Sequence, residues 1–450
     1  MMEKTRPLII YNGPMFDGKG NVYQDGAVYV ENGKIVEVGN EEEVFEKIPK
    51  RIDMDYYDAR GRVIFPGLTN LHHHFYYILS RGLMQGMKYG DLKYNLESFW
   101  WKFDSSLTPE IVQISVLLNL LDSIRHGVIT IFDHHSSPGN IENILEVIAS
   151  VAKRAGVDVA LCYEISDRHG KDNLYKALDE NINFYEKYKY SKNIKGMIGL
   201  HANFTLSDES LYEISENISV DDVGIHIHIG EDQIDLDYCQ QIGYKGPVDR
   251  LNKFNLISDK AILAHGLFLS DEDYKILKQS GAVTVCNSES NMRNSYGVFN
   301  IKKYKDIPFG LGTDGITSSM LHTLRATYLS QRQSGTVSEK IIKVLSNSLF
   351  RTNSEFASKI FRRKKGVLEK GAPADIVIFD YVPLTEFNSE TLFSHAAFGM
   401  YDSQAMVVFK EGKIIYEKGT FYTIDEELVL EESKKLSKIL WENFNKIKNS

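Results

Sequence analysis

Residues 62–74 read RVIFPGLTNLHHH, an apolar and β-branched run that ends in three consecutive histidines. Such a run predicts a buried strand with polar groups at its carboxyl end. Seven further runs of this kind follow, separated by segments of helical period, at 127–134, 158–165, 195–202, 224–229, 261–268, 282–286 and 307–313. This repeated alternation favours a closed parallel (β/α)8 TIM barrel over an open doubly wound sheet, with the chemistry at the carboxyl ends of the strands.

Both ends of the chain carry the same hairpin signal. Residues 30–35 read VENGKI and residues 409–414 read FKEGKI. Asn-Gly supplies the positive φ angles of a tight two-residue turn, and two isolated hairpins would be marginal in water. We therefore expect one small β-sandwich-like domain built from both termini, 1–60 plus 370–425. The metal-dependent barrel would occupy 61–365, and a closing helix 426–450.

Composition narrows the class of protein. Hydrophobic residues make up 43% and charged residues 25%, which is typical of an ordinary soluble globular chain. The formal net charge of −9 gives no positive field for nucleic acid, and no stretch is long and apolar enough for a membrane span. The three cysteines, Cys162, Cys239 and Cys286, lie far apart in apolar runs. They indicate reduced thiols, and we expect a cytoplasmic protein without nucleic-acid or membrane partners.

Histidines occur in pairs at two predicted strand ends. Thirteen histidines in 450 residues predict about 0.4 His-x-His pairs by chance. The chain has two, His72 with His74 and His226 with His228. Alternate side chains of a strand point to the same face, so the members of each pair point together, while His73 must point elsewhere. The alternative is that these are core histidines with ordinary hydrogen-bond partners. That interpretation fits a single histidine better than it fits two pairs at one barrel mouth.

Other polar residues end further strands. His201 follows the fourth run, His265 ends the sixth segment, and Asp314 follows the eighth. Imidazole nitrogens and a carboxylate suit zinc, iron(II) or manganese, and a site with an open position can activate water. Glu231 lies three residues beyond His228, off the inward row of the strand. That place is better suited to a proton shuttle than to a metal ligand.

These motifs resemble those of the amidohydrolase superfamily. Residues 66–74, PGLTNLHHH, resemble its PG-x-x-N-x-H-x-H signature, and His228-x-x-Glu231, Ala264-His265 and 312–315, GTDG, match later motifs in order. Residues 371–376, GAPADI, resemble its return to the small β domain. The likeness is greatest to the branch of cytosine, guanine and S-adenosylhomocysteine deaminases and triazine hydrolases. Within it, FDHHSSP at 132–138, GLHANFT at 199–205 and ESNM at 289–292 resemble SsnA-type aminohydrolases.

The resemblance implies a role for each matching residue. It implies one divalent ion, with zinc first and iron(II) or manganese as alternatives, held by His72, His74, His228 and Asp314. Glu231 would act as acid and base, His265 would orient the attacking water, and Asp314 would also collect a proton. His201 would touch the substrate. Binuclear members carry a bridging lysine at the end of strand four, where this chain has His201, so a single ion is favoured.

The pocket departs from the relatives in one motif. Where they often read Asn-Pro-x-Ser-Asn after strand seven, residues 287–291 read NSESN. Glu289 therefore adds a carboxylate near the pocket, and we count Glu289, Asn291 and His135 with His201 as candidate substrate-binding residues. Trp100 and Trp101 follow strand one. We favour packing in a lid or a subunit interface for them over stacking on the substrate.

The function expected from the sequence is that of a metal-dependent aminohydrolase. It would deaminate a small, aminated, heterocyclic substrate by attack of water on a carbon–nitrogen bond. A cyclic amidohydrolase, or a hydrolase that removes another leaving group, is the alternative, and a non-catalytic scaffold on the same fold is a remote one. We expect a homodimer whose only ligands are a metal ion and a small molecule.

Overall fold

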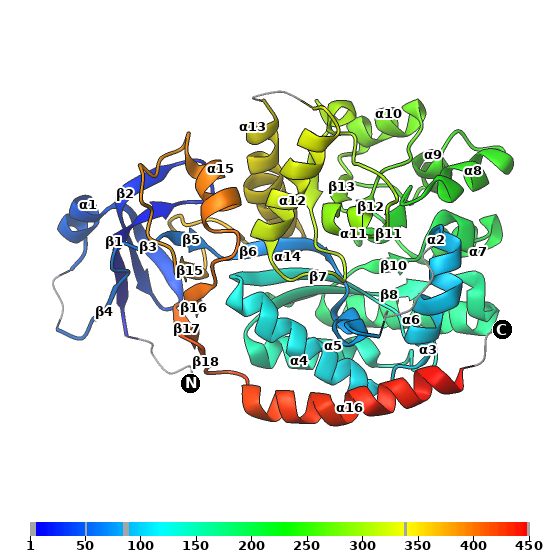
Figure 1. Ribbon diagram of the computed structural model, residues 1–450, viewed down its shortest axis with the longest axis horizontal. Helices are drawn as coiled ribbons and strands as arrows, with labels where there is room; N and C mark the ends of the chain where they lie inside the picture. Colours follow the sequence, from blue (N-terminus) through cyan, green and yellow to red (C-terminus); the bar gives the residue numbers. More distant parts are fainter. Residues whose placement is uncertain (1–5, 50–51, 84–89, 337–339, 448–450) are drawn as a thin grey trace.

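The computed structural model describes residues 6–49, 52–83, 90–336 and 340–447, and its larger part is a parallel barrel (Figure 1). Its neighbouring strands are β6 (Leu68–His73), β7 (Val128–His135), β8 (Asp158–Ile165), β10 (Ile198–Leu200), β11 (Ile225–Ile229), β12 (Ile262–His265), β13 (Val283–Cys286) and β14 (Phe309–Leu311). The ring closes where the backbone N–H groups of Thr313 and Asp314 donate to the carbonyl of His72 at 3.1 and 3.0 Å. The predicted (β/α)8 barrel is thus confirmed.

Helices surround the strands. They are α4 (Pro109–Arg125), α5 (Ile144–Ala155), α6 (Lys171–Tyr188), α7 (Asp208–Asn217), α8 (Gln233–Gln241), α9 (Pro247–Lys253), α10 (Asp271–Ser280), α11 (Ser288–Arg293), α12 (Met320–Gln333), α13 (Lys340–Ser346) and α14 (Asn353–Phe361). In α5, Ile144, Ile148, Ala152 and Ala155 are buried at helical spacing. This stripe is the reason that the segment is a helix packed on the barrel.

Short helical turns between β6 and α4 cover the carboxyl ends of the strands. They are η1 (Phe75–Ser80), α2 (Leu92–Asn95), η2 (Leu96–Trp100) and α3 (Trp101–Ser105). Among the described residues no single helix is long and apolar enough to cross a membrane. Only the pair Leu92–Ser105 and Pro109–Arg125 passes that test together, and it is bent by 107°.

A second sheet is built from both ends of the chain and lies at one end of the barrel (Figure 1). Its strands are β1 (Leu8–Phe16), β2 (Val22–Glu31), β3 (Lys34–Asn40), β4 (Asp55–Asp58), β5 (Ile64–Pro66), β15 (Ile376–Phe379), β16 (Ala405–Lys410), β17 (Lys413–Glu417) and β18 (Thr420–Phe421), with α1 (Glu41–Lys47) after β3. Val28 and Val30 of β2 share one apolar core with Val407 and Phe409 of β16. The small mixed domain from both termini is therefore present as predicted.

The two hairpin turns of this sheet meet in space. Gly33 has φ 76° and Gly412 has φ 74°, the left-handed conformation that the tight turns require. The carbonyl of Gly33 accepts from the N–H of Ala374 at 2.9 Å, and the N–H of Gly412 donates to the carbonyl of Ala374 at 2.9 Å. Ala374 is thus a hydrogen-bond partner of both turns.

Two of the expected strands are each divided in the structure. The run 62–74 breaks at Gly67, whose N–H donates to Asp375 at 2.9 Å, while the N–H of Leu68 donates to Gly127 at 2.9 Å. Its first half is β5 of the terminal sheet and its second half is β6 of the barrel. The run 195–202 breaks at Met197 into β9 (Ile194–Gly196), paired with β8, and β10, paired with β8 and β11. In the first case the hydrogen-bonding partner changes, and in the second β11 joins β8 as a partner; an apolar pattern reveals neither.

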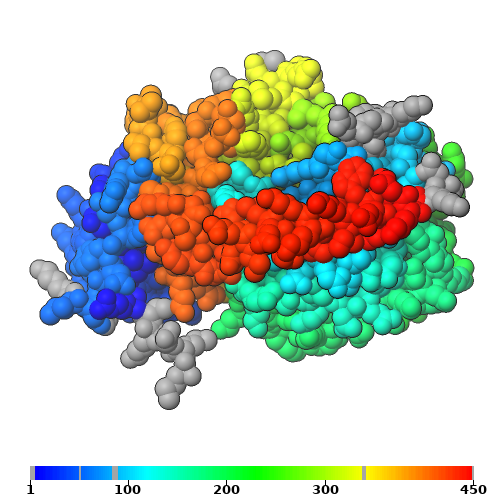
Figure 2. All heavy atoms as spheres, turned by 60° about the horizontal axis from the view of Figure 1, so that its bottom comes forward, coloured from blue at the N-terminus to red at the C-terminus, as the bar shows by residue number. Residues whose placement is uncertain are grey.

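The chain ends in α16 (Glu426–Lys446), which runs from the terminal sheet along the outside of the barrel (Figure 2). It packs against α4, where Glu426 forms an ion pair with Arg125. Leu440 is fully buried, and Asn443 donates to the carbonyl of Ser106 at 3.2 Å. The helix therefore ties the last residues to the segment that covers the barrel mouth.

Candidate active site

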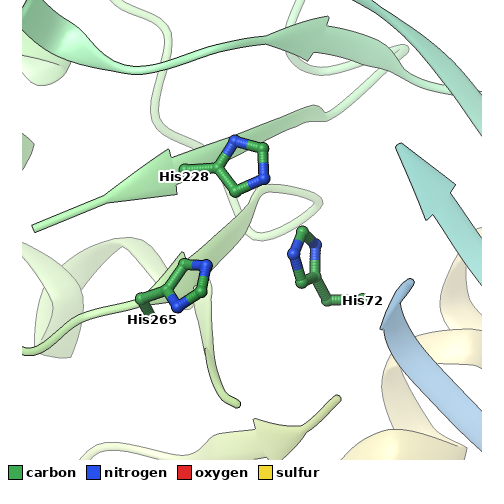
Figure 3. Close-up of side chains that lie close together, drawn as sticks. All are labelled: His72, His228 and His265. Atoms are coloured by element: carbon green, nitrogen blue, oxygen red, sulfur yellow. The ribbon is translucent and has the colours of Figure 1, made fainter. Parts of the chain in front are cut away.

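Three histidines from separate strands face one another at the carboxyl end of the barrel (Figure 3). His72 belongs to β6, His228 to β11 and His265 to β12. One ring nitrogen of each lies within 4.8 Å of the corresponding atoms of the other two. All three side chains are nearly or fully buried, because the strands that carry them line the barrel interior.

His74 and Asp314 complete this cluster. The Nε2 atom of His74 lies 3.2 Å from Nε2 of His228 and 3.3 Å from Oδ1 of Asp314. Asp314 adopts a left-handed backbone conformation with φ 54°, and His265 does so with φ 77°. Such conformations cost about 1–3 kcal/mol in non-glycine residues and cluster at functional sites. Here they turn an imidazole and a carboxylate inward over the end of β6.

The outer ring nitrogens of three histidines are held by oxygen acceptors. A carbonyl or amide oxygen only accepts, so Nδ1 carries the hydrogen and Nε2 keeps its lone pair toward the centre. The three bonds run from His74 to the carbonyl of His134 at 2.6 Å, from His228 to the carbonyl of His201 at 2.9 Å, and from His265 to Oδ1 of Asn291 at 2.9 Å. The protein thus orients its imidazoles as metal ligands are oriented.

The central atoms of two histidines lack partners among the described residues. Nε2 of His72 and Nε2 of His265 are buried and make no hydrogen bond. Burial and the neighbouring imidazoles lower the pKa of His72 well below its usual value. Neutral imidazoles with free lone pairs beside a carboxylate form a donor set that fits zinc, iron(II) or manganese. The residues present therefore fit a divalent ion.

The carboxylate of Asp314 is held in its ionised form by this surrounding. Burial alone would raise its pKa, but the imidazoles of His74 and His265 outweigh burial and lower the pKa to about 2. Its Oδ1 atom also accepts from the N–H of Gly315 at 2.7 Å. An anionic oxygen at this place complements a bound cation.

Two further histidines, His226 and His73, lie next to the cluster. Nε2 of His226 lies 2.8 Å from Nδ1 of His72, so His226 orients His72 from deeper in the barrel. His73 points away, with Nδ1 2.8 Å from Oγ1 of Thr313 and Nε2 3.1 Å from Oδ1 of Asn119 in α4. The prediction that His73 points elsewhere is confirmed.

Glu231 lies beside the cluster rather than within the row of β11. Its Oε2 atom is 3.7 Å from Nε2 of His265, and 14% of its side chain is exposed to the cavity. Burial raises the pKa of this carboxyl to about 8. Gly230, with φ 52°, makes the turn that brings Glu231 back over the strand end. A carboxyl at such a place can exchange a proton with a bound molecule.

A cavity opens over the cluster. Aromatic rings form much of its wall: Tyr77, Trp100, Trp101 and Tyr296. Leu92, Leu96 and Ile316 add apolar contacts, and most of the remaining lining is polar: His74, Asp104, Glu164, His201, His228, Glu231, His265, Ser290, Arg293, Asn294 and Asp314. The cavity is therefore lined by aromatic rings and by several carboxyl groups, beside the histidine cluster.

Of the four candidate substrate-binding residues, His201 alone lines this cavity within the described part of the chain. Glu289 turns to α12, where its Oε2 accepts from Thr323 at 2.9 Å. Asn291 contacts His265, as described above. His135 is buried behind the wall, with Nε2 3.0 Å from Oγ of Ser137. Glu289 and Asn291 lie in α11 and point to different neighbours, which the sequence motif does not show.

Sequence reasoning missed two carboxylates of the wall, Asp104 and Glu164. Asp104 is 3% exposed and its Oδ1 has no hydrogen-bond partner, and burial raises its pKa to about 7 against the effect of Arg168. Glu164 forms an ion pair with Arg168, whose guanidinium lies 4.6 Å from the ring of Trp101. Glu164 comes near the end of β8, so the strand-end rule could have found it. Asp104 lies in a short helical turn and gives no such signal.

Comparison with known proteins agrees with this architecture. The model of the amidohydrolase family matches residues 63–415, from the start of β5 to β17. The chain belongs to the amidohydrolase family. This amidohydrolase is 27% identical over 444 residues to the 5-methylthioadenosine/S-adenosylhomocysteine deaminase of Clostridium tetani, covering 95% of this chain and 97% of that one. It is 27% identical over 430 residues to the 5'-deoxyadenosine deaminase of Methanocaldococcus jannaschii, covering 93% and 98%.

Solved structures share the fold. An adenosine deaminase from Xanthomonas campestris with bound zinc superposes with a TM-score of 0.83 at 19% identity, covering 98% of this chain and 99% of that one. An atrazine chlorohydrolase from Arthrobacter aurescens complexed with zinc gives a TM-score of 0.78 at 20% identity, covering 96% and 100%. The predicted family, fold and class of enzyme, a metal-dependent hydrolase of carbon–nitrogen bonds other than peptide bonds, are confirmed.

Proposed function

We propose that this amidohydrolase is a hydrolytic deaminase of a small aminated heterocycle, and that it uses one divalent ion held by His72, His74, His228 and Asp314. The observation that carries the proposal is the set of inward, oriented imidazole nitrogens beside an ionised carboxylate, with Glu231 and His265 at its edge. Zinc is the ion to test first. When bound, such an ion makes a water molecule acidic enough to lose a proton near neutral pH.

Glu231 is the proton carrier in this proposal. Water attacks the carbon that bears the amino group, and Glu231 takes one of its protons and passes it to the ring nitrogen. Asp314 collects the second proton, which leaves with the amino nitrogen as ammonia when the carbon–nitrogen bond breaks. His265 holds the attacking oxygen through its Nε2 side, 3.7 Å from Glu231 and 3.9 Å from Oδ2 of Asp314.

The cavity wall favours a flat and polar substrate. Trp100 packs on Tyr77 with ring centroids 4.2 Å apart, and both line the cavity, as does Tyr296. Aromatic walls of this kind stack on planar rings. The names of the relatives describe deaminases of adenine compounds, so adenine nucleosides are the first class to test. His201 also lines the cavity, and in this proposal it contacts the substrate.

Ammonia release tests the proposal. The zinc-loaded protein is incubated with purine nucleosides, free purines, pyrimidines and pterins, and ammonia is measured together with the loss of the amino compound. We expect release from at least one of these classes, and a loss of release in Glu231→Gln. Glu289→Gln is the matched control, since Glu289 points away from the cavity. Zinc-loaded protein that opens a cyclic amide, and releases no ammonia from any amine, would contradict deamination.

A further inference from the structure

One buried histidine next to the cluster has a role that the proposed ligand set does not explain. His134 lies on β7, is fully buried, and its Nε2 atom is 3.0 Å from the carbonyl oxygen of Leu200. A carbonyl only accepts, so Nε2 carries the hydrogen and Nδ1 carries the lone pair. Within the described residues this Nδ1 has no hydrogen-bond partner. A buried lone pair without a donor calls for an explanation, and an ion is one.

The neighbours of His134 include two of the proposed metal ligands, and the ring centroid of His226 lies 5.2 Å away. Its ring centroid lies 4.7 Å from that of His228 and 5.7 Å from that of His74. One ring nitrogen of each of these three histidines lies within 4.8 Å of the other two. Its backbone carbonyl already accepts from Nδ1 of His74 at 2.6 Å. His134 is therefore fixed at the cluster by both its side chain and its backbone.

The next residue along the strand shows what an ordinary buried histidine looks like here. His135 is also fully buried and its Nδ1 also lacks a partner. Its ring, however, lies against Tyr76 and Tyr163, with centroids 5.0 and 5.9 Å away. It belongs to none of the ligand groups found among the described residues. The free nitrogen alone is thus no sign of a ligand; the free nitrogen beside His74 and His228 is.

We infer that His134, through Nδ1, is a further donor to the ion held by His74 and His228. The inference rests on the proposed function for the presence of that ion, and it concerns this chain's own ligand set. It makes the site richer in imidazole than the four residues named above. Imidazole donors favour zinc, iron(II) and cobalt(II) over manganese and magnesium. The inference thus also predicts the metal preference of the site.

Metal binding tests the inference without reference to activity. His134→Gln keeps an amide N–H near the carbonyl of Leu200 and removes the Nδ1 lone pair, whereas His134→Asn keeps an oxygen near the position of Nδ1. We expect His134→Gln to weaken zinc binding by about tenfold or more in competition with a chelator, and His134→Asn to restore part of it. His135→Gln, the matched control, should bind zinc as the wild-type protein does.

X-ray absorption at the zinc edge separates a ligand from a neighbour. Wild-type protein should show the imidazoles of His72, His74, His228 and His134, and His134→Gln should show one fewer. The same number of imidazoles in both proteins would overturn the inference and leave the proposed function standing. Wild-type protein that holds no stoichiometric metal would overturn both. If the Gln variant fails to fold, the wild-type spectrum decides alone, since three imidazoles in it contradict a role for His134.

Discussion

Strand β8 runs between two buried regions whose polar side chains are partnered in different ways. Asp158 begins the strand at the base of the barrel, where it forms ion pairs with both Lys365 and Lys410. Lys410 also bonds Asp375 at 2.7 Å, so two ammonium groups face two carboxylates. Near the other end of the strand is the mouth of the barrel, where neutral imidazoles face one another. At the base each charge has an opposite partner, whereas at the mouth Nε2 of His72 and Nε2 of His265 have no hydrogen-bond partner among the described residues.

This difference separates a structural cluster from a functional one. Burial and the nearby Lys410 lower the pKa of Lys365, while Asp158 and Asp375 outweigh burial and raise that of Lys410. Asp158 belongs to β8 and Lys410 to β16, while Lys365 and Asp375 lie between α14 and β15. The four side chains therefore join the barrel to the terminal sheet. A buried cluster whose charged groups pair with one another stabilises the fold. A buried set with free lone pairs is complete only with a ligand.

The largest effect is expected at the mouth. His228→Gln removes one donor from the proposed ligand set, and the remaining donors cannot complete the shell. We expect metal content to fall well below one ion per chain after dialysis, and turnover to fall to background. Elemental analysis of the dialysed protein checks this. Full occupancy in this variant would place the ion away from β11 and remove the contrast between the two regions.

At the base, Lys410→Ala leaves two buried carboxylates with one partner. Breaking a buried ion pair costs about 3–5 kcal/mol, because an uncompensated charge remains. We expect that loss in the free energy of unfolding measured with urea, with metal affinity unchanged. Lys278→Ala is the control, since Lys278 pairs with Asp306 at 3.5 Å on the surface and should cost less than about 1 kcal/mol. Equal losses in the two variants would refute a special role for the base cluster.

Glu231→Gln distinguishes a proton carrier from a ligand. The amide keeps the size of the side chain and removes the titrating group. Turnover should fall about 10²-fold or more while zinc content stays at one ion per chain. Asp314→Asn, in contrast, should lose the ion. If Glu231→Gln empties the site and Asp314→Asn leaves it full, the two roles are exchanged.

The smallest effect is a pH dependence of stability at the base. Burial would raise the pKa of Asp375, but Lys410 and Lys365 outweigh it and lower that pKa to about 2. The unfolded chain has a value of about 3.9, so the stabilisation is fully present above that pH and is lost as pH falls toward 2. Asp375→Asn should be less stable than wild type at pH 6, with a gap that narrows below pH 4. Unfolding curves at both pH values measure the gap, and a constant gap would contradict the ion pairing.

Local patterns were sufficient for much of the fold. Strand β8 matches the apolar run 158–165 to the residue, and the Asn-Gly turn of residues 32–33 forms the expected hairpin. Both signals are local, because they depend on side-chain alternation and on φ angles at adjacent residues. The division of the run 62–74 between two sheets was not predictable in this way. It depends on Asp375 and Gly127, which lie far away in sequence.

The same distinction between local patterns and long-range contacts applies to the candidate site. The types of the proposed ligands and their strand-end spacing could be read from residues 72–74, 228–231 and 314, because a strand places alternate side chains on one face. The orientation of Glu289 and His135 could not, and both lie off the cavity. Asp104 and Glu164 line it, and the pairing of Glu164 with Arg168 is a contact between side chains that no pattern of single residues encodes.

The amino-acid sequence by itself therefore determined the barrel, the sheet from both termini and the histidines and carboxylate at the strand ends. These follow from periodicities of two and 3.6 residues and from the short range of turn chemistry. Only the tertiary structure decided which buried polar atoms are satisfied: the ion pairs of Lys410 at the base, the oriented imidazoles at the mouth and the free Nδ1 of His134. Satisfaction depends on distances between atoms of different strands, and these are set by packing of the whole chain.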